Sequence, residues 1–196
     1  MTNFVPIFPL EIVVYPGEEL NLHIFEPRYK QLILEINENK KPFGIPSVIA
    51  GQVSEMGTLM ELVEIKEIYD NGEMDIKTRG VKLFRILELV KSIPDKLYGG
   101  AIVNYIENYN NGNSILMKKV IEGIRQLHAI LKVNKVFKQS DEALGSYDVA
   151  HHAGLSLNEE YELLQIMQEL QRQEYLRQHL LKVLPVLAEM ETLKDR

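Results

Sequence analysis

The chain of 196 residues contains no cysteine. It therefore cannot form disulfides, use a thiolate nucleophile or bind a metal through sulfur. No apolar run approaches the length of a membrane-spanning helix. The first apolar run holds Pro6, Pro9 and Glu11 and has no basic residue before it, so we expect no signal peptide and a cytoplasmic protein. The composition, 45% hydrophobic and 26% charged, is typical of an ordinary globular chain.

The sequence also lacks the common signatures of catalysis. No phosphate-binding G-x-x-x-x-G-K-[ST] loop, no G-x-G-x-x-G turn after a strand and no G-x-S-x-G elbow occurs. His151 and His152 form a pair near Asp148, but neighbouring side chains on a helix diverge, so we expect them to cover helices rather than bind a metal. His23 lies between two apolar residues and is interpreted as a hydrogen-bonded structural residue, with a catalytic base as the alternative. We predict no cofactor and no metal.

The net charge of −6 is unevenly distributed along the chain. Basic residues dominate residues 118–138, where Glu122 is the single acidic side chain, and acidic residues dominate 141–174, where Arg172 is the single basic one. We interpret the two stretches as neighbouring helices of complementary charge, with a basic face for an acidic partner as the alternative. Neither half of the chain has the charge of a nucleic-acid-binding protein.

Residues 5–109 have the short alternating apolar pattern of β-strands. The alternation in residues 20–24 indicates a half-buried strand, and Pro16-Gly17 predicts a turn before it. Asn71-Gly72 is typical of a hairpin turn, whereas Gly80 is expected to interrupt the strand that follows. Pro46 predicts an edge strand or a bulge. Six or so strands joined in this way predict a small barrel that is closed or nearly closed.

One helix is expected early in this half. The residue before a proline avoids the α region and a proline suits the first turn of a helix, so Glu26-Pro27 predicts a helix start. Its predicted buried stripe consists of Tyr29, Leu32, Ile33 and Ile36.

From residue 114 the apolar period changes to that of a helix. Ser114 is the expected N-cap of a helix whose apolar stripe runs from Met117 to Leu131, and Ser156-x-x-Glu159 is a capping box. Pro185 is expected to kink or end the last helix. The predicted fold class is α+β, with a β-barrel subdomain over residues 1–110 and a bundle of three or four helices over residues 114–196.

Residues 8–29, FPLEIVVYPGEELNLHIFEPRY, resemble the opening of the amino-terminal domain of Lon proteases, whose pattern is PL-x(2)-VV-x-PG followed by L-x-LHIFEPRY. We call residues 8–29 the Lon-like stretch. Its matching residues are Pro9, Leu10, Val13, Val14, Pro16, Gly17, Leu20, Leu22, His23, Ile24, Phe25, Glu26, Pro27, Arg28 and Tyr29. Gly57 and Gly80 fall at later landmarks of the family, and residues 172–176 resemble the R-L-x-x-L segment of its helical part. Leu83 and Gln173 depart from the residues that are common there.

The resemblance implies a PUA-like β-barrel followed by a helical bundle that engages substrate proteins. The ATPase and serine-lysine peptidase modules of the family's full-length enzymes do not follow, so we expect no ATP or peptide hydrolysis. The implied partners are unfolded or damaged protein or peptide, with a protease or ATPase in trans for an adaptor in proteolysis or quality control. A PUA-like RNA-binding or small-ligand module is the alternative, although an acidic first half disfavours RNA.

The residues of the Lon-like stretch are expected to act structurally. Phe25 is predicted to be buried at the corner between the second strand and the first helix, so that its replacement by alanine costs about 3–5 kcal/mol. Arg28 is expected to pair with Glu26 or a buried carbonyl. Apolar residues on both faces of strands 43–50 and 59–68 predict an apolar groove, bordered by acidic side chains, that takes up extended peptide.

Overall fold

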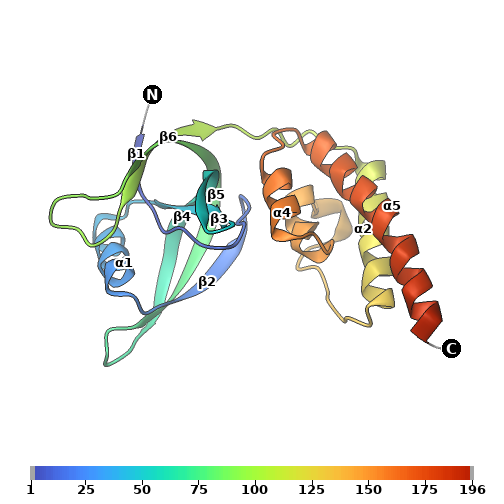
Figure 1. The fold of residues 1–196 in the computed structure, drawn as a ribbon, viewed down its shortest axis with the longest axis horizontal. Helices are drawn as coiled ribbons and strands as arrows, with labels where there is room; N and C mark the ends of the chain where they lie inside the picture. The colour runs from blue at the N-terminus through green and yellow to red at the C-terminus, as the bar shows by residue number, and fades with distance from the viewer. Residues whose placement is uncertain (1–2, 195–196) are drawn as a thin grey trace. The chain divides into compact units, whose positions relative to one another are not determined.

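The computed structural model describes residues 3–194 and divides into two compact units, one up to Glu107 and one from Asn108 (Figure 1). The first unit, here called the sheet unit, contains six strands and one helix. The strands are β1 (Asn3–Pro6), β2 (Glu19–Ile24), β3 (Phe43–Ile49), β4 (Gln52–Ile68), β5 (Met74–Val90) and β6 (Gly100–Ile106), and the helix is α1 (Pro27–Asn39).

All six strands belong to one antiparallel sheet with the order β1-β6-β5-β4-β3, and β2 pairs with β5 beside this path. β3 is at the end of the order and its register shifts between Pro46 and Val48, as the proline predicted. The segment after β1 also reaches β3, since Phe8 N donates to Gly44 O at 2.8 Å and Val48 N donates to Leu10 O at 2.8 Å. The antiparallel sheet is observed, whereas its closure as a PUA-like barrel stays a prediction.

β4 and β5 form a long hairpin of 17 residues in each strand. Its turn contains Asn71-Gly72, as predicted, and Gly72 has a φ of 76° that favours glycine. The expectation that Gly80 interrupts β5 is wrong, because the strand continues through it with a register shift in the ladder to β4. Gly80 instead bonds the Pro-Gly corner: its N–H donates to Glu18 O at 2.8 Å and its carbonyl accepts from Gly17 N at 2.9 Å.

The sheet unit has two buried clusters, and the one that contains α1 lies between this helix and the sheet. The buried residues of α1 are the four that its apolar stripe predicted, Tyr29, Leu32, Ile33 and Ile36. They pack in one cluster with Ile24 of β2, Met60 of β4 and Met74 of β5. Pro27 occupies the first turn of α1, and Lys40 ends the helix in the left-handed conformation.

The second unit, here called the helical unit, is helical from residue 114. It contains α2 (Ser114–Ile130), α3 (Ser146–Val149), α4 (Leu157–Leu164) and α5 (Glu169–Lys194), with short 3₁₀ helices at Asp141–Ala143 and Ala150–His152. α2 and α5 lie side by side (Figure 1). The packing of these helices as a bundle of three or four stays a prediction.

Four local predictions for the helical unit have different outcomes. The capping box of Ser156 and Glu159 is confirmed at the start of α4. The N-cap of α2 is Asn113 rather than Ser114, because the Asn113 side chain accepts from Leu116 N at 2.9 Å. Leu131 is exposed beyond the end of α2, and α5 continues past Pro185 to Lys194, so the proline does not end the helix.

A buried polar network fixes the start of α5. The Arg172 guanidinium is fully buried and donates to the Glu169 carboxylate at 2.9 Å and to the backbone carbonyls of Ile166 and Met167 at 2.8 and 2.9 Å. Ser146 Oγ donates to Glu169 at 2.6 Å and accepts from Arg172 Nε at 2.9 Å. Because its groups satisfy one another, the network ties α3 to α5.

Candidate functional site

The chain passes from β2 into α1 at Pro27, because proline suits the first turn of a helix. Ile24 is the last residue of β2, and Glu26 has an extended conformation (φ −73°, ψ 134°) before Pro27 enters the helix. Glu26 O accepts from the backbone N–H groups of Tyr29 and Lys30 at 3.0 Å each. The Glu26 carboxylate pairs with Arg28, at 3.0 Å from Nε and 2.8 Å from Nη2, so this expected pairing is observed.

The corner places neighbouring residues of the Lon-like stretch in opposite environments. Ile24 and Tyr29 are buried, and the Tyr29 ring stacks on Phe8 with a centroid separation of 3.8 Å. The side chains of His23, Phe25 and Arg28 face solvent. Phe25 is 59% exposed, so the prediction of a buried Phe25 is wrong. Alternation along β2 puts His23 on the face opposite the buried Ile24, and Phe25 is the first residue after the strand.

Three rings and two carboxylates meet at this corner, and we call this set the corner surface: His23, Phe25, Tyr69, Glu73 and Asp75. The His23 ring lies 6.3 Å from the Phe25 ring and 5.9 Å from the Tyr69 ring, centroid to centroid. His23 Nδ1 contacts Asp75 Oδ1 at 2.7 Å and His23 Nε2 contacts Glu73 Oε2 at 3.0 Å. Tyr69 Oη donates to Asp75 Oδ2 at 2.7 Å.

These contacts shift the titration of their groups. The hydrogen bonds to Asp75 and then Glu73 raise the pKa of His23 above 6.5, because both carboxylates favour the charged ring. The hydrogen bonds from Tyr69 and then His23 lower the pKa of Asp75. The hydrogen bond to Asp75 raises the pKa of Tyr69 to about 12. Both His23 nitrogens already contact carboxylates, so His23 is not available as a general base. What the corner surface presents to a binding partner is the faces of its rings and negative charge.

The sequence interpretation of His23 as a hydrogen-bonded residue agrees with these contacts, but it missed the partners. Glu73 and Asp75 are 50 and 52 residues away along the chain. The Asn-Gly turn was a usable signal, because it fixes the β4–β5 hairpin near these residues. His23 lies opposite Asp75 only because β2 pairs with β5, and no local sequence pattern indicates that pairing.

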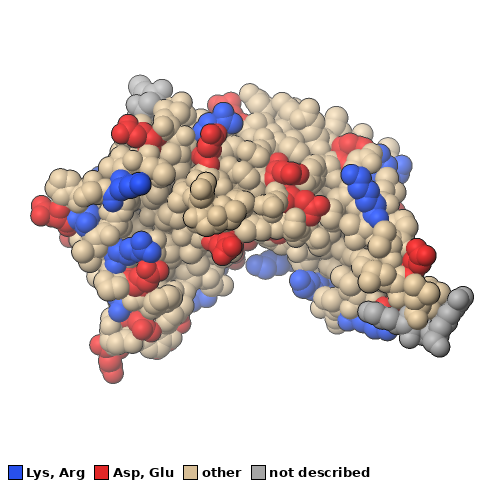
Figure 2. Space-filling model, in the orientation of Figure 1, with Lys and Arg blue, Asp and Glu red and all other residues tan. Residues whose placement is uncertain are grey.

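The β4–β5 hairpin around the corner surface is acidic. Residues 64–77 contain five acidic and two basic side chains, and Figure 2 shows acidic atoms at the end of the sheet unit where Figure 1 places this hairpin. Val63 and Ile68 of β4 are exposed, whereas residues 43–47 of β3 are buried. The predicted apolar surplus therefore lies on β4 and not on β3.

Among the remaining matching residues of the Lon-like stretch and its later landmarks, Gly17 and Pro27 are exposed and the others are buried or half-buried. Pro9, Leu10 and Pro16 are half-buried, and Gly17 has a φ of 86° in the turn before β2. Gly57 and Gly80 are buried, and a Cβ atom would lie 2.5 Å from the Ile45 carbonyl oxygen at Gly57 and 2.5 Å from the Tyr15 carbonyl oxygen at Gly80. Only glycine allows the two backbones to approach so closely.

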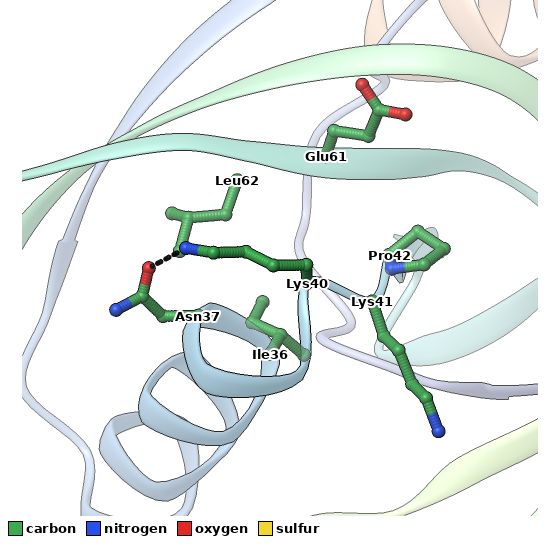
Figure 3. Close-up of a pocket in the computed structure, with 7 residues that line it drawn as sticks. All are labelled: Ile36, Asn37, Lys40, Lys41, Pro42, Glu61 and Leu62. Carbon is green, nitrogen blue, oxygen red and sulfur yellow. Dashed lines mark hydrogen bonds between the residues drawn. The ribbon is translucent and has the colours of Figure 1, made fainter.

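A second candidate is a hollow beside the end of α1 (Figure 3). It is lined by Ile36, Asn37, Lys40, Lys41, Pro42, Glu61 and Leu62. Lys40 Nζ donates to Asn37 Oδ1 at 3.1 Å, while the Lys41 and Glu61 side chains point away from each other. Its volume of about 170 Å³ is below the roughly 300–1,000 Å³ of ligand pockets. It is too small and too charged to be the predicted apolar groove.

The histidine pair of the helical unit contacts one helix, α4, and one loop residue, Phe137. His151 Nδ1 contacts Glu160 at 2.7 Å, and the His152 ring packs edge-on against Phe137 at 5.0 Å. Burial and then the nearby His128 lower the pKa of His152. Within residues 3–194, no three side chains of the metal-binding types are grouped to hold an ion. In the same range, no helix is both long enough and apolar enough to cross a membrane.

The fold is that of Lon amino-terminal domains. The crystal structure of a Lon N-terminal domain protein from Xanthomonas campestris matches with a TM-score of 0.68 and 21% identity, covering 89% of this chain and 96% of that one. The N-terminal domain of the Mycobacterium avium complex Lon protease matches with a TM-score of 0.64 and 13% identity, covering 91% and 98%.

A family model adds sequence evidence to this structural likeness. The model of the ATP-dependent protease La (LON) substrate-binding domain matches residues 5–182, so this chain belongs to that family. The resemblance seen in the Lon-like stretch is thereby confirmed, and the match extends through the helical unit to about the middle of α5.

Proposed function

We propose that this chain is a non-catalytic domain that binds extended segments of unfolded protein at the corner surface. The observation that carries the proposal is the exposed Phe25 ring, which lies within the Lon-like stretch and beside two further exposed rings. Membership of a substrate-binding family supports a role in protein recognition.

The size of the exposed ring supports a contribution to binding. An aromatic side chain buries about 150–250 Å², so covering the 59% of Phe25 that is exposed removes about 90–150 Å² from water, worth about 2–4 kcal/mol. Ordering a flexible client offsets part of this gain. The expected binding is therefore weak, tolerant of sequence and dominated by apolar contacts, so added salt should weaken it little.

We also propose an adaptor role for this chain and an architecture of a PUA-like barrel with a helical subdomain. A domain that holds unfolded segments without hydrolysing them can act as an adaptor that presents clients to a protease or ATPase in trans. The hydrogen bonds from residues 8–10 to β3 support closure of the sheet as a PUA-like barrel. The division between Glu107 and Asn108 supports separate barrel and helical subdomains.

Replacing single exposed rings tests the proposed site. Phe25→Ala should weaken binding of a chemically unfolded protein at least fivefold, measured by fluorescence anisotropy of the labelled client. Tyr105→Ala is the control, because Tyr105 is an exposed aromatic residue of β6 that does not belong to the corner surface. Equal affinities of the wild type and Phe25→Ala for the client would show that the corner surface is not the binding site.

A further inference from the structure

β2 leaves one edge of the sheet open. Its ladder to β5 runs without a register shift from Glu19 opposite Arg79 to Ile24 opposite Met74. β2 pairs with no other strand, and Figure 1 shows it as the outermost strand beside β5. Among residues 3–194, no backbone hydrogen bond joins residues 19–24 to a segment on the other side. In an antiparallel ladder alternate residues point their N–H and C=O groups outward. Because Gly80 N donates to Glu18 O at the start of this ladder, Leu20, Leu22 and Ile24 point these groups toward β5, and Asn21 and His23 point theirs away from it.

The edges of the sheet at β3 and at the outer part of β4 are protected. β3 has Pro46 and a bulge, and its outer side accepts the backbone of residues 8–10. The part of β4 beyond β3 has two register shifts and alternating charged residues. Proline, bulges and charge are the usual means of preventing an edge from pairing with another chain. β2 has no proline and no bulge in its six residues.

The chemistry of an open edge selects its occupant. A row of alternating N–H and C=O groups is matched by an extended backbone, and strand addition is a recurring mode of peptide recognition. One face of an added strand would lie beside the half-buried Leu20 and Leu22, and the other beside His23 and the exposed Phe25. Apolar side chains at alternate positions of the occupant fit both faces.

Charge distinguishes a client segment from a second copy of this chain. Residues 64–77, which include the part of β5 that pairs with β2, contain five acidic and two basic side chains, and the whole chain has a net charge of −6. Glu19 contacts Lys77, and Glu73 and Asp75 contact His23, so the excess negative charge belongs to the hairpin as a whole. Pairing two β2 edges would bring two such acidic hairpins toward each other. A neutral or basic segment meets no such repulsion.

We propose that an extended client segment adds as a strand to the free edge of β2, with its alternate apolar side chains beside Leu22 and Phe25. This inference rests on the proposed function, and it specifies how the client binds and which class of segment is bound. The segment is free of proline, apolar at alternate positions, and richer in lysine and arginine than in aspartate and glutamate. β2 spans about 20 Å, which corresponds to about six residues of an extended segment.

Backbone methylation of the ligand tests strand addition without altering the protein. The probe is a fluorescein-labelled octapeptide of alternating valine and lysine, compared with versions N-methylated at odd or at even positions. One series removes the N–H groups that face β2 and should weaken binding to the full chain at least tenfold, while the other should weaken it less than threefold. Hydrogen exchange should show slower exchange at alternate amides of residues 19–24 when the unmodified peptide binds.

The outcomes separate this inference from the proposed function. Equal binding of both N-methylated series, or binding of an unfolded protein without binding of the octapeptide, overturns strand addition and leaves the proposed function standing. Protection of residues 19–24 that grows with protein concentration in the absence of peptide overturns it in favour of a second copy. Failure of both the octapeptide and the unfolded protein to bind refutes the proposed function. A glutamate version of the peptide that binds as tightly as the lysine version contradicts the assigned charge preference.

Discussion

Tyr29 and Phe25 should respond very differently to truncation, although both are aromatic residues of the same short stretch. Tyr29 is 5% exposed and stacks on Phe8. Losing its ring forfeits about 1.5–3 kcal/mol of apolar transfer, and the cavity and the lost ring pair raise the cost of Tyr29→Ala to about 3–5 kcal/mol. Phe25 is 59% exposed, so Phe25→Ala should cost less than about 1 kcal/mol of unfolding free energy.

Urea denaturation followed by far-UV circular dichroism measures both losses, with Tyr105→Ala as the exposed control. The Tyr29→Ala loss should appear as a lower midpoint in the transition of the sheet unit with an unchanged m value. An equal loss of stability for Phe25→Ala and Tyr29→Ala would contradict the exposed position of Phe25. That result would mean that the Phe25 ring is covered in solution and belongs to the core of the sheet unit.

Two further predictions concern charged groups. Arg172→Ala should cost about 3–5 kcal/mol in urea denaturation, because it leaves the Glu169 carboxylate buried without its partner; an unchanged midpoint would contradict the role of the network. His23 should titrate above pH 6.5 in NMR, and Asp75→Asn should return its pKa toward 6.5. Because the folded pKa lies above the unfolded one, the stabilisation from its carboxylate contacts is complete below pH 6.5 and is lost as the pH rises through the raised pKa. A His23 pKa at or below 6.5 in the wild type would contradict the observed contacts.

Local signals in the sequence predicted the elements that depend on local chemistry. The buried stripe of α1 follows from its period of 3.6 residues, and the turn at Asn71-Gly72 follows from the positive φ that glycine allows. Pro46 indicated the edge position of β3 because proline lacks the N–H that a central strand needs. The Lon-like stretch then indicated the family through residue identities, which physical patterns alone did not supply.

The misplaced residues depend on contacts distant in sequence. Alternation places Phe25 on one face of β2 but does not reveal whether a second layer covers that face. Gly80 was read as a break, yet it is the point at which the Pro16-Gly17 corner joins β5. The corner surface needs the β2–β5 ladder, which joins residues about fifty positions apart. The contacts of His23 with Glu73 and Asp75 were therefore not predictable from the local sequence pattern.

A parallel titration of three ligands tests the central claim most directly. The full chain is titrated with one labelled protein in its native form, the same protein chemically unfolded, and a single-stranded RNA, each at low and at moderate salt. We expect the chain to bind the unfolded form alone, with an affinity that changes less than about threefold between the two salt concentrations. RNA binding through phosphate contacts would instead fall steeply with salt. Tight, salt-sensitive RNA binding with no affinity for the unfolded protein would contradict the account.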